Sequence, residues 1–173
     1  MATRTQSILA AARKAGQKTL SEYDSKRILA AYGIPVSREV LVSTLAEAKA
    51  AAAKIGYPVV LKACSADEAH KTEKGLIAVN LASQKALTDA FAMIAERAGK
   101  EYDGAFLVQE MVSGAREIMI GMHRDASFGP SVAFGLGGIF TEILQDVVFR
   151  IAPLRKRDAR DMMRGIRAHK ILD

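Results

Sequence analysis

The sequence predicts an α+β fold with antiparallel strand pairs, and three observations lead to this prediction. Four strand-length apolar segments follow one another closely between residues 105 and 153. Strands so close together leave no room for the helical crossovers that parallel pairing requires. Amphipathic helical segments precede and follow this run, and two more apolar segments flank a charged loop in the first half of the chain. We therefore expect helices packed on antiparallel sheets, without an internal repeat.

Length and composition favour a soluble protein of one domain or two small lobes. The chain has 173 residues, of which 50% are hydrophobic and 25% charged, enough to bury a core. Its apolar runs are shorter than the roughly 20 residues of a membrane span. Cys64 is the single cysteine, and no apolar signal-peptide core follows the N-terminus, so we expect a cytoplasmic protein. The acid-free residues 1–20 also suit a mitochondrial presequence, which stays an alternative.

The net charge of +6 raises the question of a nucleic-acid partner, which its distribution argues against. Residues 1–20 contribute +4, residues 150–173 contribute +5, and residues 21–149 sum to −3. Nucleic-acid modules gather basic and aromatic side chains on one surface, whereas aromatic residues make up 6% of this chain. Solvated helix faces explain the charge better, so we expect neither a nucleic-acid nor a membrane partner.

Start and stop signals define the helices. Ser21, with Asp24 three residues on, begins a helix that Gly33 ends, and Thr44 and Glu47 form the capping box of the next helix. Further helices are expected over residues 1–20, after Ser83 and over residues 158–171. Strands are expected over residues 36–42, 58–64, 76–81, 105–112, 116–123, 131–136 and 146–153.

A lysine and a charged loop interrupt the apolar pattern between residues 58 and 81. Lys62 lies within the apolar run "PVVLKAC", where an unpaired ammonium group is costly to bury. We expect it to reach a carboxylate or a phosphate, the alternative being a side chain that extends to water. The loop "SADEAHKTEKGL" follows, and its Gly75 permits a close backbone approach to phosphate oxygens.

Two later segments have the composition of a nucleotide site. In "VQEMVSGARE", exposed backbone groups at Met111 and Val112 can recognise an adenine edge, and Glu117 can bind ribose hydroxyls. Solvent-facing glutamates of a strand are the alternative. In "FGLGGIF", Gly137 and Gly138 suit either a tight turn or a loop over phosphates. The latter segment is not the dinucleotide fingerprint, because the third glycine is missing.

In this order, the segments "LSEYDSKRILAAYGIPV", "PVVLKACSADEAHKTEKG", "LVQEMVSGAREIMIGMH" and "FGLGGIFTEILQDVVFRIAPL" resemble one family over residues 7–173. They are similar to the ATP-grasp domain of NDP-forming acyl-CoA synthetases of the ADP-forming acetyl-CoA synthetase type, related to succinyl-CoA synthetase β subunits. The resemblance implies an ATP-grasp fold with the nucleotide between two lobes. It implies an N-terminal helix over residues 1–20, a small lobe over 21–108 and a large lobe over 109–173.

The resemblance also implies roles for individual residues in binding ATP or ADP. Lys62 would hold phosphates, Glu110, Met111 and Val112 would form the hinge around adenine, and Glu117 would bind ribose. The glycine loops at Gly75, Gly137 and Gly138 would lie near the nucleotide.

The resemblance assigns catalysis to His70 and Arg150. His70 matches a histidine that relays a phosphoryl group to and from a phosphohistidine on the CoA-binding partner, and imidazole is a competent nucleophile near pH 7. Arg150, Lys62, loop amides and Mg²⁺ would stabilise the transferred group. His123 and His169 lack such a context, and we expect both at the surface.

The implied reaction converts acyl-CoA, ADP and phosphate into acid, CoA and ATP, reversibly, with CoA bound by a partner α subunit or domain. Two departures from the family qualify it. The family has a pair of glycines after the histidine loop, whereas here Gly75 is followed by Leu76. The family's last strands, which carry metal ligands, have no counterpart after "HKILD". We expect a truncated β subunit, active only with its partner, in which Glu142 and Asp146 are candidate substitute ligands. The alternatives are a catalytically silent nucleotide-binding subunit and another ATP-grasp ligase.

Overall fold

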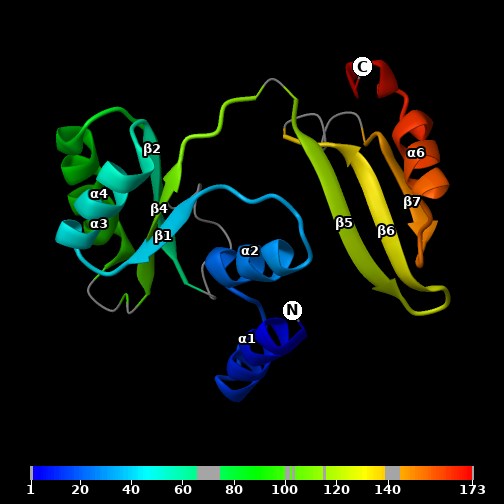
Figure 1. The fold of residues 1–173 in the computed structure, drawn as a ribbon, viewed down its shortest axis with the longest axis horizontal. Helices are drawn as coiled ribbons and strands as arrows, with labels where there is room; N and C mark the ends of the chain where they lie inside the picture. The colour runs from blue at the N-terminus through cyan, green and yellow to red at the C-terminus, as the bar shows by residue number, and fades with distance from the viewer. Residues whose placement is uncertain are drawn as a thin grey trace. The chain divides into compact units, whose positions relative to one another are not determined.

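The computed structural model describes residues 2–65, 75–99, 102, 104–114, 116–138 and 145–172. The chain forms two compact units, Met1–Val112 and Ser113–Asp173. Helices and antiparallel sheets occur in both, so the α+β prediction is confirmed (Figure 1). The lobe boundaries that the resemblance implies stay a prediction. No described helix combines the length and hydropathy of a membrane span.

The first unit contains four helices and a four-stranded sheet among the described residues. They are α1 (Ala2–Lys14), α2 (Glu22–Ala31), β1 (Glu39–Val42), α3 (Leu45–Ile55), β2 (Val59–Cys64), β3 (Ile77–Leu81), α4 (Gln84–Ala98) and β4 (Ala105–Glu110). The strand order is β1-β4-β2-β3, and each neighbouring pair is antiparallel. Sequential neighbours β2 and β3 pair directly, whereas β4 inserts between β1 and β2.

The expected helix starts are confirmed by their hydrogen bonds. The Ser21 hydroxyl oxygen accepts from the Asp24 backbone N–H at 3.1 Å, at the start of α2. At the start of α3, the Thr44 hydroxyl accepts from the Glu47 N–H at 3.2 Å, and the Glu47 carboxylate accepts from the Thr44 N–H at 3.1 Å. These bonds satisfy N–H groups that have no partner within the helix.

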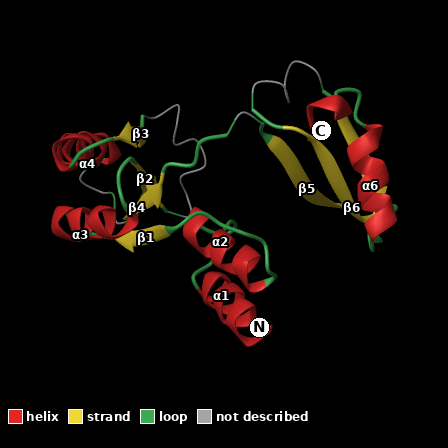
Figure 2. Cartoon of the chain, turned by 45° about the horizontal axis from the view of Figure 1, so that its top comes forward, coloured by secondary structure: helices red, strands yellow, loops and turns green. Residues whose placement is uncertain are grey.

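The core of the first unit lies between the sheet and helices α3 and α4. Apolar side chains of α3 and α4, such as Ala52 and Ile94, pack on Leu61 and Val108 of the central strands. Helix α2 lies on the other side of the sheet (Figures 1 and 2). Because side chains alternate along a strand, Leu61 faces the core and Lys62 faces the side of α2.

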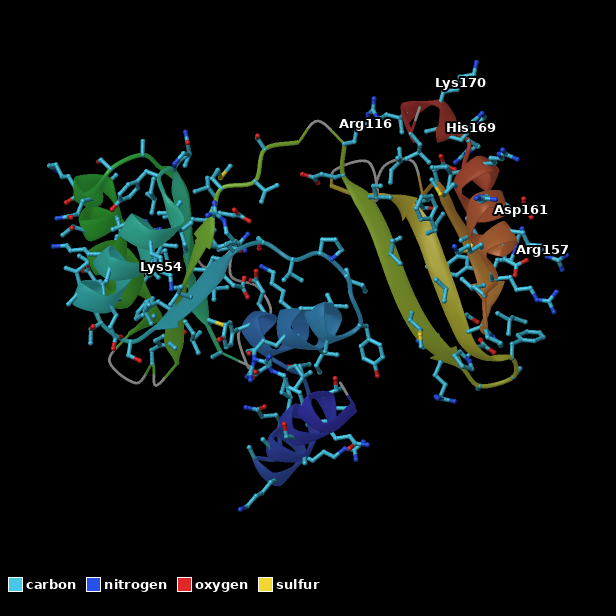
Figure 3. The ribbon with its side chains drawn as sticks, viewed as in Figure 1. Lys54, Arg116, Arg157, Asp161, His169 and Lys170 are labelled. Atoms are coloured by element: carbon cyan, nitrogen blue, oxygen red, sulfur yellow. The ribbon has the colours of Figure 1, made fainter. Side chains whose placement is uncertain are left out.

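The second unit contains β5 (Ile118–Asp125), β6 (Gly129–Leu136), β7 (Val147–Ile151), α6 (Lys156–Gly165) and the 3₁₀ helix η1 (His169–Leu172). The sheet order is β5-β6-β7, antiparallel throughout. Met162 of α6 and the following Ile166 pack on Phe134 and Leu136 of β6. Arg157 and Asp161 lie on the outer side of α6, away from this core (Figure 3).

Apolar side chains of β5 remain exposed on the face of the sheet that α6 partly covers. Helix α6 packs on β6 and β7. Ile118, Ile120 and Met122 stand opposite Leu136, Phe134 and Val132 in the β5–β6 register, so they share that face. Their exposed fractions are 49%, 73% and 71%.

Two expected helices are wrong in their extent. The helix expected over residues 1–20 ends as α1 at Lys14. The helix expected over residues 158–171 ends as α6 at Gly165, and the chain resumes as η1. Asp146, just before β7, accepts from the backbone N–H groups of Arg167 and Ala168, both at 2.8 Å. A continuous helix would use those N–H groups for bonds to carbonyl oxygens four residues earlier, so the distant carboxylate replaces part of the helix.

Candidate functional site

Lys62 reaches a carboxylate, one of the two partners that the sequence predicts. Its Nζ lies 2.8 Å from Oε1 of Glu22, at the first position of α2. The Lys62 side chain is 17% exposed and that of Glu22 is 25% exposed. A pair that is largely withdrawn from water but still reached by solvent is held more firmly than a surface ion pair.

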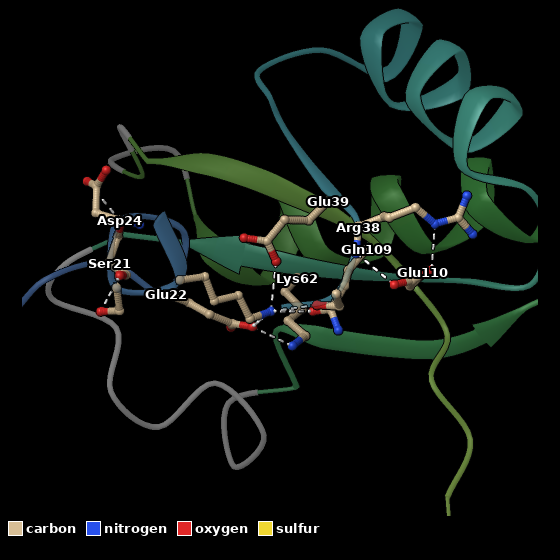
Figure 4. Close-up of polar contacts among 11 residues, drawn as sticks. Ser21, Glu22, Asp24, Arg38, Glu39, Lys62, Gln109 and Glu110 are labelled. Atoms are coloured by element: carbon tan, nitrogen blue, oxygen red, sulfur yellow. Dashed lines mark hydrogen bonds and ion pairs between the residues drawn. The ribbon is translucent and has the colours of Figure 1, made fainter. Parts of the chain in front are cut away.

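Lys26 extends this pair into a polar network on the same face of the sheet. Figure 4 labels Glu22, Lys62, Glu39 and Gln109 of this network. The Lys26 Nζ donates to Glu22 Oε1 at 2.9 Å and to Glu39 Oε2 at 2.7 Å. It also donates to Gln109 Oε1 and to Ser37 Oγ, both at 3.1 Å. Helix α2 is thereby tied to β1 and β2 through ion pairs and to β4 through the Gln109 amide.

The network holds Glu22 and Lys26 in their charged forms. Burial raises the pKa of Glu22, but the hydrogen bonds and charges of Lys62 and Lys26 outweigh it and lower the pKa to about 2. Burial lowers the pKa of Lys26, but Glu39 and Glu22 outweigh it, and the net shift is upward. Both groups are therefore ionised near pH 7.

The expected adenine hinge is partly engaged in contacts within the first unit. The carboxylate of Glu110 accepts from the backbone N–H and from Nε of Arg38, each at 2.7 Å. The Met111 N–H donates to the Pro58 carbonyl oxygen at 3.2 Å, so this N–H already has a partner, and the role of Met111 in the hinge stays a prediction. The sheet hydrogen bonding continues past the end of β4. Val112 has an exposed side chain.

In the second unit, the structure brings Glu117 together with Gly137 and Gly138, three of the expected nucleotide residues. The Gly137 N–H donates to the Glu117 carbonyl oxygen at 2.8 Å. A Cβ atom at Gly137 would lie 3.0 Å from the Glu117 carbonyl carbon, and one at Gly138 would overlap the Glu117 carboxylate. Gly138 also has a φ of +60°, which favours glycine. The "GLGG" turn is thus fitted against Glu117.

Arg150 is not part of this group. Arg150 of β7 pairs with Val132 of β6. Val132 lies four residues before Leu136, and Gly137 follows Leu136 directly. Four strand residues span about 13 Å. Arg150 contributes instead to an open hollow of about 630 Å³. The other residues that line this hollow are His123, Asp125, Phe128, Ser131, Phe149 and Ile151.

Gly75 ends the charged loop beside α4. It has a φ of +65°, and its carbonyl oxygen accepts from Nη1 of Arg97 at 3.2 Å. A Cβ atom at this position would overlap the Arg97 guanidinium group. The positive φ therefore favours glycine at position 75, and the contact of Gly75 in the first unit is with Arg97 of α4.

Among the described residues, no group of three or more His, Cys, Asp or Glu side chains comes together. Asp146 is buried, and both its oxygens accept backbone N–H bonds, so it is a structural anchor rather than a substitute ligand. Burial raises the pKa of Asp146, but those bonds outweigh it and the net shift is downward. Glu142 and His70 lie outside the described residues, while His123 and His169 are exposed as expected.

We did not predict Glu22, Lys26 and Glu39 from the sequence. One local signal was available, because Glu22 and Lys26 are four residues apart on a helix, the spacing of a stabilising ion pair. Nothing local indicates that the same carboxylate meets Lys62, which is 40 residues further along the chain.

Known proteins similar to this chain share both its sequence and its fold. A family model described as an ATP-grasp domain matches residues 11–173. The acetate–CoA ligase (ADP-forming) II subunit beta of Pyrococcus furiosus is 42% identical over 161 residues, which are 91% of this chain and 68% of that subunit. The 4-hydroxybutyrate–CoA ligase (ADP-forming) of Nitrosopumilus maritimus is 39% identical over 165 residues, 92% of this chain but 24% of that longer protein.

Solved structures give the same result. An acetyl-coenzyme A synthetase 1 of Ca. Korarchaeum cryptofilum, in complex with coenzyme A, Ca-AMPCP and HgCl⁺, matches with a TM-score of 0.92 at 39% identity. The match covers 97% of this chain and 75% of that chain. A further structure of that synthetase, with coenzyme A and Mg-AMPPCP, has a phosphohistidine segment pointing towards the nucleotide binding site and matches with a TM-score of 0.84. The chain therefore belongs to the ATP-grasp family, and its relatives include ADP-forming acetate–CoA ligase β subunits, as its motifs predict.

Proposed function

We propose that this chain is the ATP- and ADP-binding subunit of an acid–CoA ligase (ADP-forming), which interconverts acyl-CoA, ADP and phosphate with acid, CoA and ATP. The observation that carries the proposal is the 42% identity to a β subunit of this activity over 91% of the chain. The presence of a phosphohistidine segment in a structural relative supports a phosphohistidine relay.

Lys62 is the proposed phosphate-binding group of the first unit. Its ammonium group already contacts an anionic oxygen at 2.8 Å, a distance at which a phosphate oxygen would also bind. A fixed ammonium stabilises the negative charge of phosphates without reorganisation at the moment of transfer. Val112 and the neighbouring main chain are the proposed contacts for adenine.

Glu117 and the "GLGG" turn are the proposed nucleotide contacts of the second unit. The Glu117 carboxylate is exposed and suited to accept bonds from ribose hydroxyls. The N–H of Gly137 is already bonded to Glu117, so we assign the phosphate contact of this turn to the Gly138 amide. A role for Arg150 in stabilising the phosphoryl group is proposed from the family resemblance and not from its position, because Arg150 stands opposite Val132, about 13 Å along the strand from this turn.

The proposed relay residue is His70, and the proposed partner is a CoA-binding subunit or domain. Several of the relatives are themselves β subunits, which supports a partner of this kind. Mg²⁺ is proposed to accompany the nucleotide, which the structure of a relative with coenzyme A and Mg-AMPPCP supports.

Labelling with γ-radioactive ATP in the presence of Mg²⁺, with and without the CoA-binding partner, tests the relay. We expect acid-labile, base-stable label on the wild type, and loss of that label in His70→Ala. His169→Ala is the matched control, because His169 is exposed and has no proposed role. Binding of ADP without a labelled histidine would favour the alternative of a catalytically silent nucleotide-binding subunit.

A further inference from the structure

Glu22 binds the Lys62 ammonium group, to which the proposed function assigns phosphate binding. Its Oε1 accepts from Lys62 at 2.8 Å and from Lys26 at 2.9 Å, so two ammonium groups converge on one oxygen. Among the described residues, Glu22 is the carboxylate that forms an ion pair with Lys62. A nucleotide phosphate that binds Lys62 from the same direction must take the place of this oxygen.

The network allows Glu22 to release Lys62 without leaving an unpaired charge. Glu22 keeps its bond to Lys26, and Lys26 keeps its bonds to Glu39, Gln109 and Ser37. Removing one partner from a buried ion pair is costly when the other charge is left alone. Here one lysine remains on Glu22 and the other gains a phosphate, so each charge stays paired through the exchange.

The position of Glu22 on the helix also suits it to this role. It lies in the first turn of α2, where the helix dipole stabilises a negative charge. The carboxylate is therefore stable with Lys26 alone. Both Glu22 and Lys62 keep some contact with solvent, so a ligand can approach the pair.

We propose that Glu22 is the exchangeable partner of Lys62, which nucleotide phosphate displaces and which thereby limits the affinity for ADP. The proposal rests on the proposed function, because it requires Lys62 to bind phosphate. Glu22 is a positioning residue in this account: it holds the Lys62 ammonium group in place before the nucleotide arrives. Its carboxylate competes only with ligands that carry phosphate.

Calorimetric titration of the 173-residue chain with ADP and with adenosine tests the exchange. In Glu22→Gln we expect ADP to bind about threefold to tenfold more tightly, which corresponds to about 0.7 to 1.4 kcal/mol. Adenosine affinity should not change. The matched control is Glu39→Gln, which removes the same charge from the same network but contacts Lys26 and not Lys62. It should leave ADP affinity near the wild-type value.

The Lys62→Met variant separates failure of this inference from failure of the proposed function. If Lys62 binds phosphate, Lys62→Met loses about 10-fold to 100-fold in ADP affinity, and adding Glu22→Gln then has no effect. If Glu22→Gln binds ADP no more tightly than the wild type while Lys62→Met clearly loses affinity, the exchange is wrong but the phosphate-binding role of Lys62 stands. Wild-type chain that binds no ADP, or Lys62→Met that binds normally, would overturn both.

A second variant covers the case in which Glu22→Gln folds poorly. Glu22→Asp keeps the charge and its helix position but shortens the side chain by one methylene, which moves the carboxylate away from Lys62. We expect a smaller increase in ADP affinity than in Glu22→Gln, again without a change for adenosine. Equal gains for ADP and adenosine would show a general loosening of the fold and contradict the exchange.

Discussion

The carboxylate of Glu22 links the stability of the first unit to pH. Burial raises its pKa, but Lys62 and Lys26 lower it to about 2, whereas a glutamate in an unfolded chain titrates near ~4.3. A carboxyl group with a depressed pKa contributes stability above its unfolded pKa. That contribution is lost as the pH falls through the folded value, here between about pH 4.3 and about pH 2.

We therefore expect Glu22→Gln to lower the free energy of unfolding by roughly 1–2 kcal/mol near neutral pH, after allowance for partial exposure. The difference from the wild type should shrink as the pH approaches about 2. Urea unfolding followed by circular dichroism across this range measures it. Glu96→Gln, at an exposed position of α4, is the control. A difference that stays constant with pH would contradict the role given to the two lysines.

The same residues show how far sequence reasoning reaches at this scale. The apolar surroundings of Lys62 required an anionic partner, and the structure supplies one. Which anion it is depended on packing α2 against β2, a contact 40 residues apart that no local pattern encodes. Likewise, the hydrogen bond from the Met111 N–H to Pro58 follows from strand register rather than from residue type, so the sequence did not predict it.

Among whole elements, the helices with local capping signals were predicted best. Ser21, Thr44 and Ser83 each accept the expected hydrogen bond at a helix start. The end of α6 was predicted wrongly, because the group that interrupts the helix is Asp146, which precedes β7. A signal 20 residues away cannot be read from helical periodicity.

Asp146 should therefore control the junction between α6 and η1. Replacing it by alanine leaves the N–H groups of Arg167 and Ala168 without their acceptor, and we expect a loss of about 1–3 kcal/mol. Hydrogen exchange at these two amides should accelerate together with the loss of stability. Asp161→Ala, on the outer side of α6 (Figure 3), is the matched control and should change stability by less than about 0.5 kcal/mol. Equal effects of the two variants would refute the anchoring role.

Across the whole molecule, the proposed nucleotide contacts are divided between the two units. Lys62 belongs to the unit that ends at Val112, and Glu117 belongs to the unit that begins at Ser113. A ligand that contacts only the folded form stabilises every unit it touches, by about 2.7 kcal/mol at 100 times its dissociation constant.

Saturating ADP should accordingly slow hydrogen exchange in both units. We expect protection around β2 and α2 in the first unit and around Glu117 and the "GLGG" turn in the second. Adenosine 5′-monophosphate at the same fractional saturation is a suitable comparison, since it carries fewer phosphate groups. Protection confined to one unit would mean that the other does not take part in nucleotide binding.

The exposed side chains of Ile118, Ile120 and Met122 have a consequence for the behaviour of the protein in solution. They form an apolar stripe on β5, a strand of eight residues at the edge of the described three-stranded sheet. Edge strands of this kind pair readily with other chains, and apolar stripes promote aggregation. Self-association should therefore increase with protein concentration, and a charged residue in place of Ile120 should raise the concentration at which the chain precipitates.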